Sequence, residues 1–194
     1  DVPMERGTLK IGGNPVKLKT CHQAIRAGMG LVPEDRKAAG LLLDKSVKVN
    51  ISLSSLPRLS RLTVIKRKAE QETVKRFSDA LQIKTPSFEQ LAEKLSGGNQ
   101  QKVVVARWLA TNSDILIFDE PTRGIDVAAK QEIYKLMRQL TGEGKSILMV
   151  SSDMEELLGM ADRLVVLTEG QKAGEVEKAD FDAHKILDMA SGQR

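Results

Sequence analysis

The apolar run at residues 115–118, Ile-Leu-Ile-Phe, ends at the paired acids Asp119 and Glu120 and then at Pro121, and it is the feature that most limits how this chain can fold. Four apolar residues without alternation are typical of a strand buried on both faces. Further short apolar strands are predicted at residues 30–32, 147–150 and 164–167. Helical patterns at 99–109, 128–140 and 155–159 alternate with the later strands. This alternation predicts an α/β fold with a parallel sheet covered by helices on both faces.

The remaining segments predict additions to that core. Residues 8–11 and 16–18 read as a β-hairpin joined by Gly-Gly-Asn-Pro, followed by a short helix at 21–27. Residues 46–96 read as helices joined by polar turns, and the clearest helix is expected at 62–81. A last strand at 172–176 and a helix at 181–190 are expected near the end. We therefore expect four segments: an N-terminal β region at 1–45, an inserted helical subdomain at 46–98, the α/β core at 99–170, and a C-terminal strand and helix at 171–194.

Composition excludes several classes of protein. Cys21 is the only cysteine, so neither an internal disulfide nor a cysteine metal cluster can form. A net charge of +4 with 3% aromatic residues gives no stacking platform for nucleic acid, and no nucleic-acid partner is expected. No apolar run approaches the roughly 20 residues that cross a bilayer. The chain therefore reads as cytosolic, and any membrane partner would have to supply the spanning helices.

Two patterns carry chemistry. Asp119 and Glu120 follow a buried strand, at the edge where open α/β sheets bind ligands. One carboxylate could hold a metal and the other orient a water, although a solvated acidic pair is an equally common meaning of this motif alone. Upstream, Ser96, Gly97 and Gly98 precede a helix, whose free N–H groups and positive end could seat an anion. An ordinary serine cap with a glycine turn is the alternative interpretation, and it becomes untenable for the whole sequence 95–101, Leu-Ser-Gly-Gly-Asn-Gln-Gln, at this spacing.

Residues 95–101, followed by 119–126 (Asp-Glu-Pro-Thr-Arg-Gly-Ile-Asp) and 151–156 (Ser-Ser-Asp-Met-Glu-Glu), resemble the nucleotide-binding domains of ABC transporters. They match the signature, Walker B and neighbouring motifs of that family. With residues 33–36 (Pro-Glu-Asp-Arg), they look most like the second cassette in the tandem ATPase subunits of bacterial monosaccharide importers of the ribose and galactose type. The resemblance covers essentially the whole chain, and it implies a P-loop NTPase core.

The resemblance implies roles for the matching residues, and it implies which cofactors and protein partners the chain would bind. Ser96, Gly97 and Gly98 would reach the γ-phosphate of ATP held by a second cassette, Asp119 would support Mg²⁺, and Glu120 would be the catalytic base. The other residues implied to contact ATP are Gln100, Asp126, Glu34 and Ser152. The expected cofactors are ATP and Mg²⁺. The expected partners are transmembrane permease subunits, whose coupling helix would dock on residues 34–81, and indirectly a sugar-binding protein. The subunit would lie peripherally on the cytoplasmic face of the membrane.

The sequence departs from the family pattern at three places. Glu34 stands where most cassettes have glutamine, and Ser152 where most have histidine, so this cassette's own ATP site is expected to be weakened. The Walker A loop, Gly-x-x-x-x-Gly-Lys-Ser/Thr, is not seen. Residues 144–146, Gly-Lys-Ser, imitate its tail, but residue 139 is Gln139 and the order of helix and strand is reversed. We expect the chain to begin just after that loop, to expose apolar sheet faces, and so to self-associate.

Two other functions compete with an importer ATPase at this stage. One is a soluble ABC ATPase without a transporter, which long coiled coils or extra charged domains would favour. The other is a non-catalytic interaction module that docks a membrane subunit, and by itself the piece is expected to be inactive.

Overall fold

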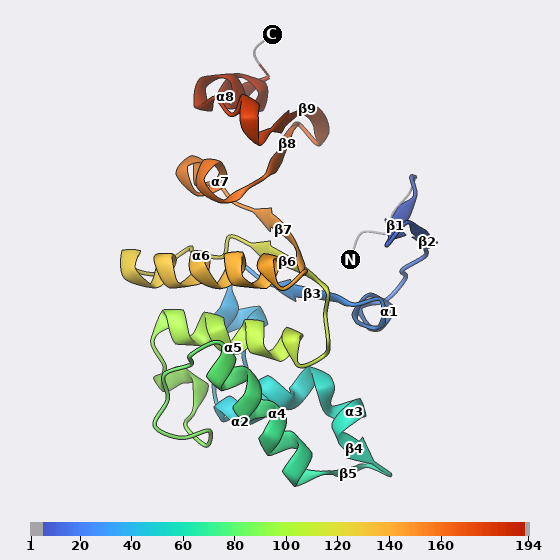
Figure 1. Ribbon diagram of the computed structural model, residues 1–194, viewed down its shortest axis with the longest axis vertical. Helices are drawn as coiled ribbons and strands as arrows, with labels where there is room; N and C mark the ends of the chain where they lie inside the picture. Colours follow the sequence, from blue (N-terminus) through green and yellow to red (C-terminus); the bar gives the residue numbers. More distant parts are fainter. Residues whose placement is uncertain (1–5, 193–194) are drawn as a thin grey trace. The chain divides into compact units, whose positions relative to one another are not determined.

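The computed structural model describes residues 6–192, which form two compact units that divide between Leu148 and Met149 (Figure 1). A three-stranded sheet has the order β3-β6-β7, with bounds β3 Met29–Val32, β6 Ile115–Asp119 and β7 Ser146–Val150. Strands β3 and β6 run parallel, with Met29 opposite Ile115 and Val32 opposite Phe118. The predicted α/β class and its parallel strands are therefore confirmed.

Helix α5 (Gly97–Leu109) lies at the centre of the first unit. It contacts β3 and the helices α2, α4 and α6. Its consecutive residues Val103, Val104, Val105 and Ala106 are all 0% exposed, which is the pattern of a helix buried on every side. The first turn of α5 is also the segment expected to seat an anion, so the core packing fixes the direction in which that turn points.

Gly30 allows β3 and α5 to pack closely. A Cβ atom on Gly30 would lie 2.8 Å from Cβ and 2.9 Å from Cγ of Trp108, atoms near the helix backbone that cannot swing away. Gly30→Ala is therefore expected to lower the free energy of unfolding by about 2 kcal/mol through overpacking, measured by urea denaturation. The control is Gly142→Ala in α6, where nothing lies within 4 Å of the added Cβ. That change should stabilise the chain by about 0.5–1 kcal/mol, and equal effects of the two variants would contradict the packing argument.

The helical subdomain gathers around α5 in Figure 1. It comprises α2 (Val47–Ser52), α3 (Leu56–Leu59) and α4 (Arg67–Ala80), with 3-10 turns at Leu53–Ser55 and Ala92–Lys94. The predicted helix at 62–81 is wrong at its start, because a small β-hairpin precedes α4. Its strands are β4 (Ser60–Arg61) and β5 (Val64–Ile65), joined by Leu62 and Thr63. The hairpin escaped prediction because its turn has neither glycine nor asparagine.

The N-terminal hairpin and the flanking helices follow the predictions more closely. Strands β1 (Leu9–Ile11) and β2 (Asn14–Val16) pair antiparallel around Gly12 and Gly13, whose φ angles of 56° and 81° suit a two-residue hairpin turn. Helix α1 (Cys21–Arg26) contacts β3, and α6 (Val127–Gly142) contacts α5. A short π-helical turn, η1 (Arg36–Gly40), follows β3.

One face of the sheet in the first unit is open, which corrects the prediction of helices on both faces. Val32, Leu116 and Phe118 are fully buried on one face, whereas Leu31 is 47% and Leu148 58% exposed. Exposed apolar side chains were expected from the sequence; self-association of the chain stays a prediction.

The second unit has its own small core. Strand β8 (Arg163–Thr168) pairs antiparallel with β9 (Gln171–Glu177), so the prediction that β8 extends the parallel sheet is wrong. Antiparallel pairing follows because only a tight turn separates the two strands. Helices α7 (Met154–Met160) and α8 (Ala183–Ser191) complete this unit. Its buried apolar residues are Leu164, Val166, Val176 and Ile186.

Within residues 6–192, no helix is both long and apolar enough to cross a membrane. The sequence predicts four segments, whereas the structure divides into two units. The boundaries of the four segments stay a prediction.

Candidate functional site

The candidate site lies at the carboxyl edge of the parallel strands β3 and β6. Since the two strands are neighbours, the loops that follow them leave the sheet at the same edge. Asp119 is the last residue of β6, and Glu120 follows it with a φ of 45°, a left-handed conformation that non-glycine residues rarely adopt. Backbone strain of this kind is frequent at functional sites. The two predicted acids thus stand where the strand turns sharply.

Glu34, in the loop after β3, forms an ion pair with Arg123, in the loop after β6. Both side chains are largely exposed. From the sequence, Glu34 was expected to place an unwanted negative charge near phosphates. The structure supplies a counter-ion from the same chain, and Arg123 thereby reduces the repulsion that this carboxylate would exert on an anion.

Arg36 connects three predicted motifs. Its Nε donates a hydrogen bond to Oε1 of Gln100, at 3.4 Å, and its Nη1 donates to the carbonyl oxygen of Arg123, at 3.3 Å. Its Nη2 lies 2.7 Å from the place that a Cβ on Gly97 would occupy, so the guanidinium packs directly over that glycine. One side chain therefore ties the segment after β3 to the first turn of α5 and to the loop after β6.

The first turn of α5 keeps the features expected of an anion seat. Ser96 is the exposed N-cap residue, and its side chain makes no capping hydrogen bond to the helix backbone. Its Oγ instead accepts a hydrogen bond from Nδ2 of Asn99, at 2.9 Å. Gly98 is buried, and an added Cβ there would lie 3.0 Å from Cβ of Ala129 in α6. The absence of side chains at 97 and 98 is thus required by packing as well as by any approaching phosphate.

Gln100 and Asp126 both use their side chains inside the chain. Nε2 of Gln100 donates to the carbonyl oxygen of Ala92, at 3.0 Å, while its Oε1 accepts from Arg36. Asp126 is the N-cap of α6, and its Oδ1 accepts from the backbone N–H of Ala129, at 2.9 Å. Their expected contacts with ATP remain predictions, and the structure gives each a positioning role.

Ser152 belongs to the second unit, where it lies between β7 and α7. The preceding residue, Ser151, makes two hydrogen bonds through its Oγ. It accepts from the backbone N–H of Asp153, at 3.1 Å, and it donates to the buried carboxylate of Glu156. Asp153 in turn caps α7 by accepting from the N–H groups of residues 155 and 156. The turn that carries Ser152 is therefore well organised within its own unit.

Arg36 and Arg123 lie in the motifs at 33–36 and 119–126, but the sequence alone predicts no role for either residue. The signal for Arg36 is its position, since a cation two residues after Glu34 could contact the same site. Reasoning from sequence also missed Asn50, a polar residue inside the apolar turns of α2, whose signal is an asparagine in a segment that must be buried.

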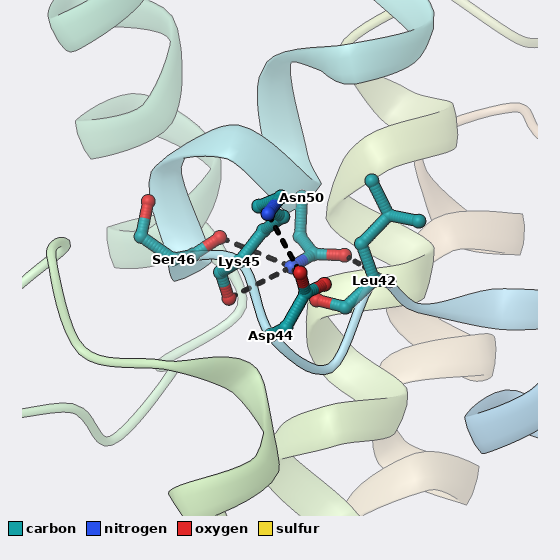
Figure 2. A network of polar contacts seen from close by, with 5 residues as sticks. All are labelled: Leu42, Asp44, Lys45, Ser46 and Asn50. Carbon is teal, nitrogen blue, oxygen red and sulfur yellow. Dashed lines mark hydrogen bonds and ion pairs between the residues drawn. The ribbon is translucent and has the colours of Figure 1, made fainter.

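Asn50 is fully buried and organises the loop that precedes α2 (Figure 2). Its Oδ1 accepts from the N–H of Leu42, at 2.9 Å. The two N–H groups of its Nδ2 are shared among three carbonyl oxygens, those of Leu42 at 2.8 Å, Lys45 at 3.3 Å and Ser46 at 3.0 Å. Every capacity of the amide is used, and the loop at 42–46 is held onto α2.

Arg107 of α5 completes this network. Its Nε donates to the carbonyl oxygen of Asn50 and its Nη2 to Oδ1 of Asn50, both at 2.7 Å. Burial lowers the pKa of Arg107 to about 10, so the guanidinium remains charged at neutral pH. A buried cation is thus satisfied by an amide and a carbonyl, and it joins α5 to the loop at 42–46.

The donor set limits which metal the site could hold. Among residues 6–192, no group of three or more His, Cys, Asp or Glu side chains is placed to bind a metal ion. Mg²⁺ is commonly held by one or two carboxylates together with substrate phosphates and water. Asp119 at the end of β6 fits that mode of binding, which needs a phosphate-bearing ligand as well.

A family model described as ABC transporter matches residues 1–123. The ribose import ATP-binding protein RbsA of Bacillus licheniformis is 46% identical over 192 residues, which cover 99% of this chain and 39% of that protein. The ribose import ATP-binding protein RbsA 2 of Streptomyces coelicolor is 46% identical over 191 residues, covering 97% and 37%. The chain therefore spans about two fifths of the length of these relatives.

Solved structures agree on the fold. A nucleotide-free ATP-binding cassette from an ABC transporter superposes with a TM-score of 0.78 at 19% identity, covering 96% of this chain and 75% of that chain. The cbiO1 protein of Clostridium perfringens, part of an ABC transporter complex, gives a TM-score of 0.75 at 20% identity, covering 98% and 73%. Both comparisons concern architecture alone.

Proposed function

The chain belongs to the ABC transporter family, and from this premise we propose that it is part of the ATP-hydrolysing subunit of an importer for ribose or a related monosaccharide. The sequence relatives named above are import ATP-binding proteins for ribose. The subunit acts at the cytoplasmic face of the membrane, where it binds permease subunits that receive sugar from a binding protein. A second cassette faces it, and ATP lies between the two.

In this proposal the chain supplies one half of a composite ATP site through its signature segment. The uncapped N–H groups of the first turn of α5, with Ser96, bind the γ-phosphate of ATP that the second cassette holds. Arg36 holds this turn in place through Gln100. The chain contributes Glu120 as the base that accepts a proton from the attacking water, and Asp119 as a ligand for Mg²⁺. The metal supplies charge neutralisation on the phosphates when it is bound.

The observation that carries the proposal is the convergence at Arg36. Segments that are distant in the sequence, at 33–36, 96–100 and 119–126, meet through its hydrogen bonds and through the Glu34–Arg123 ion pair. Phosphoryl-transfer sites depend mainly on positioning and electrostatic stabilisation, and this convergence provides the positioning. Asp126 and Ser152 take part at the cassette interface in the proposal, each from an organised helix-capping turn.

The test compares Ser96, in the signature segment, with Ser152, which belongs to this cassette's own ATP site. Both are replaced in the longer subunit that contains this chain, assembled with its permease. Ser96→Ala should lower ATPase turnover by at least about tenfold, since it removes a group aimed at transferred phosphate. Ser152→Ala should have a much smaller effect, because that position already lacks the family's histidine. Both serines are exposed, so neither variant should change the melting temperature. Equal losses of turnover would contradict the assignment of the signature face as the active half.

A further inference from the structure

The β4–β5 hairpin exposes apolar side chains that the first unit does not cover. Leu62 is 87% exposed, Val64 69% and Ile65 38%, and every residue from 61 to 68 is exposed. In Figure 1 the hairpin projects from the end of the helical subdomain. Aliphatic side chains in contact with water contribute little to folding, so their presence at this place needs another reason.

The turn of this hairpin is unfavourable for the residues it contains. Leu62 and Thr63 have φ angles of 51° and 68°. Two-residue turns with both φ angles positive prefer Asn-Gly, because a Cβ atom is strained in this conformation. A leucine at the apex is therefore supported neither by local conformation nor by packing within the chain. Strain that the fold retains without benefit to itself commonly marks a functional surface.

The charge around the hairpin is one-sided. Between Asp44 and Glu70 the sequence has seven Lys or Arg residues and no Asp or Glu, although the net charge of the whole chain is only +4. Lys45 and Lys48 are paired with Asp44 and Glu89, and Arg58 donates to the carbonyl oxygen of Ala110. The other four flank the turn, and within the described chain none of them forms an ion pair with a carboxylate: Arg61, Lys66, Arg67 and Lys68.

The apolar residues point to both faces of the hairpin. Val64 pairs with Arg61 and Ile65 pairs with Ser60. Successive residues of a strand point to opposite faces, so Val64 and Ile65 lie on different faces and Leu62 extends from the tip. A flat protein surface would cover one face only. The headgroup region of a bilayer surrounds an inserted tip on all sides, while Lys and Arg at its base extend their long side chains to the lipid phosphates.

We propose that the β4–β5 hairpin inserts its apolar tip into an anionic membrane surface, with the cations that flank it bound to lipid headgroups. The proposal does not depend on ATP hydrolysis or on the transported sugar. It assigns this surface to lipid, and a permease as its sole partner is an outcome that would overturn it.

The decisive variant makes the turn conformationally more favourable and removes the apolar side chain at its tip. Leu62→Asn combined with Thr63→Gly gives the favoured Asn-Gly turn, so the melting temperature should stay the same or rise. Vesicles of phosphatidylcholine and phosphatidylglycerol in equal parts should carry the unaltered chain upward in a flotation gradient. The variant should bind these vesicles about tenfold more weakly, because it loses the leucine that enters the apolar region. Equal binding by the two proteins would overturn the proposal.

A charge-matched pair of variants tests the cations. Lys66→Gln, Arg67→Gln and Lys68→Gln together should weaken vesicle binding by about tenfold or more, since each cation near an anionic surface adds about fivefold. Lys10→Gln, Lys17→Gln and Lys19→Gln remove the same charge from exposed positions near the N-terminal hairpin, and should have little effect. Equal losses would show attraction by net charge alone and overturn the proposal. Binding only to vesicles that contain permease, or equal binding to pure phosphatidylcholine, would overturn it as well.

Discussion

Asn50→Ala is expected to lower the free energy of unfolding by about 3 kcal/mol, the largest stability change that we predict for a single substitution in this chain. The alanine leaves the N–H of Leu42 without its acceptor, and it removes one of the two acceptors of Arg107. The carbonyl oxygens of Leu42, Lys45 and Ser46 lose the amide donor but keep a backbone N–H each. A buried guanidinium that loses an acceptor is costly, because less of its desolvation is then compensated. Urea denaturation followed by the fluorescence of Trp108, the only tryptophan, measures the change in α5 itself.

Two comparisons make this prediction specific. Asn14→Ala removes an exposed asparagine whose side chain bonds only to the carbonyl oxygen of Gly12, so it should change stability by no more than about 0.5 kcal/mol. Asn50→Leu combined with Arg107→Met replaces both polar groups by apolar ones and should be less destabilising than Asn50→Ala. A double variant that is less stable than the single one would contradict the view that the unpaired cation dominates the cost.

Arg36→Ala is expected to lower the ATPase turnover of the longer subunit by about tenfold while changing the KM for ATP much less. The substitution leaves Glu120 and Ser96 in place, but it removes the hydrogen bonds that join the first turn of α5 to the loop after β6. The signature turn and the acidic edge can then move independently. This prediction rests on the proposed function, and steady-state kinetics on the assembled transporter measures it.

The control for Arg36 is its neighbour. Lys37 is exposed, and among the described residues its side chain forms no hydrogen bond or ion pair, so Lys37→Ala removes a nearby charge without removing a positioning contact. Arg36→Lys should not restore turnover, because an ammonium group cannot reproduce the two divergent hydrogen bonds of a guanidinium. Hydrogen exchange on this chain alone should show faster exchange at residues 97–102 in Arg36→Ala. Faster exchange with normal turnover would leave the contact structural and refute its role in hydrolysis.

The parallel core could be read from the sequence because apolar runs and helical periodicity report burial directly. Strand β6 and helices α5 and α6 begin and end within two residues of the prediction. The β4–β5 hairpin could not be read, since Leu62 and Thr63 are poor turn residues and Ile65 continues the periodicity of α4 backward. Its apolar residues imitate a buried helical face although they are exposed in the structure.

The candidate site likewise has a part that the sequence predicts and a part that it does not. Residues of the acidic edge and the signature turn were predictable, because their types and spacing form a known pattern. Contacts between distant segments were not: nothing in a local window places Arg36 over Gly97 or pairs Glu34 with Arg123. Likewise, the role of Asn50 depends on Arg107, which lies on another helix and is reached only after the chain folds.

The pairing of β3 with β6 has a consequence for the order in which the chain is made. The whole helical subdomain is synthesised after β3 and before β6, so β3 leaves the ribosome without its neighbour in the sheet. Contacts among α2, α4 and α5 can form during that interval, whereas the sheet must wait for its second strand. Until then, Leu31 and Val32 lack their partners in β6. A nascent chain stalled before residue 115 should therefore be a folded helical subdomain attached to a strand that still lacks β6.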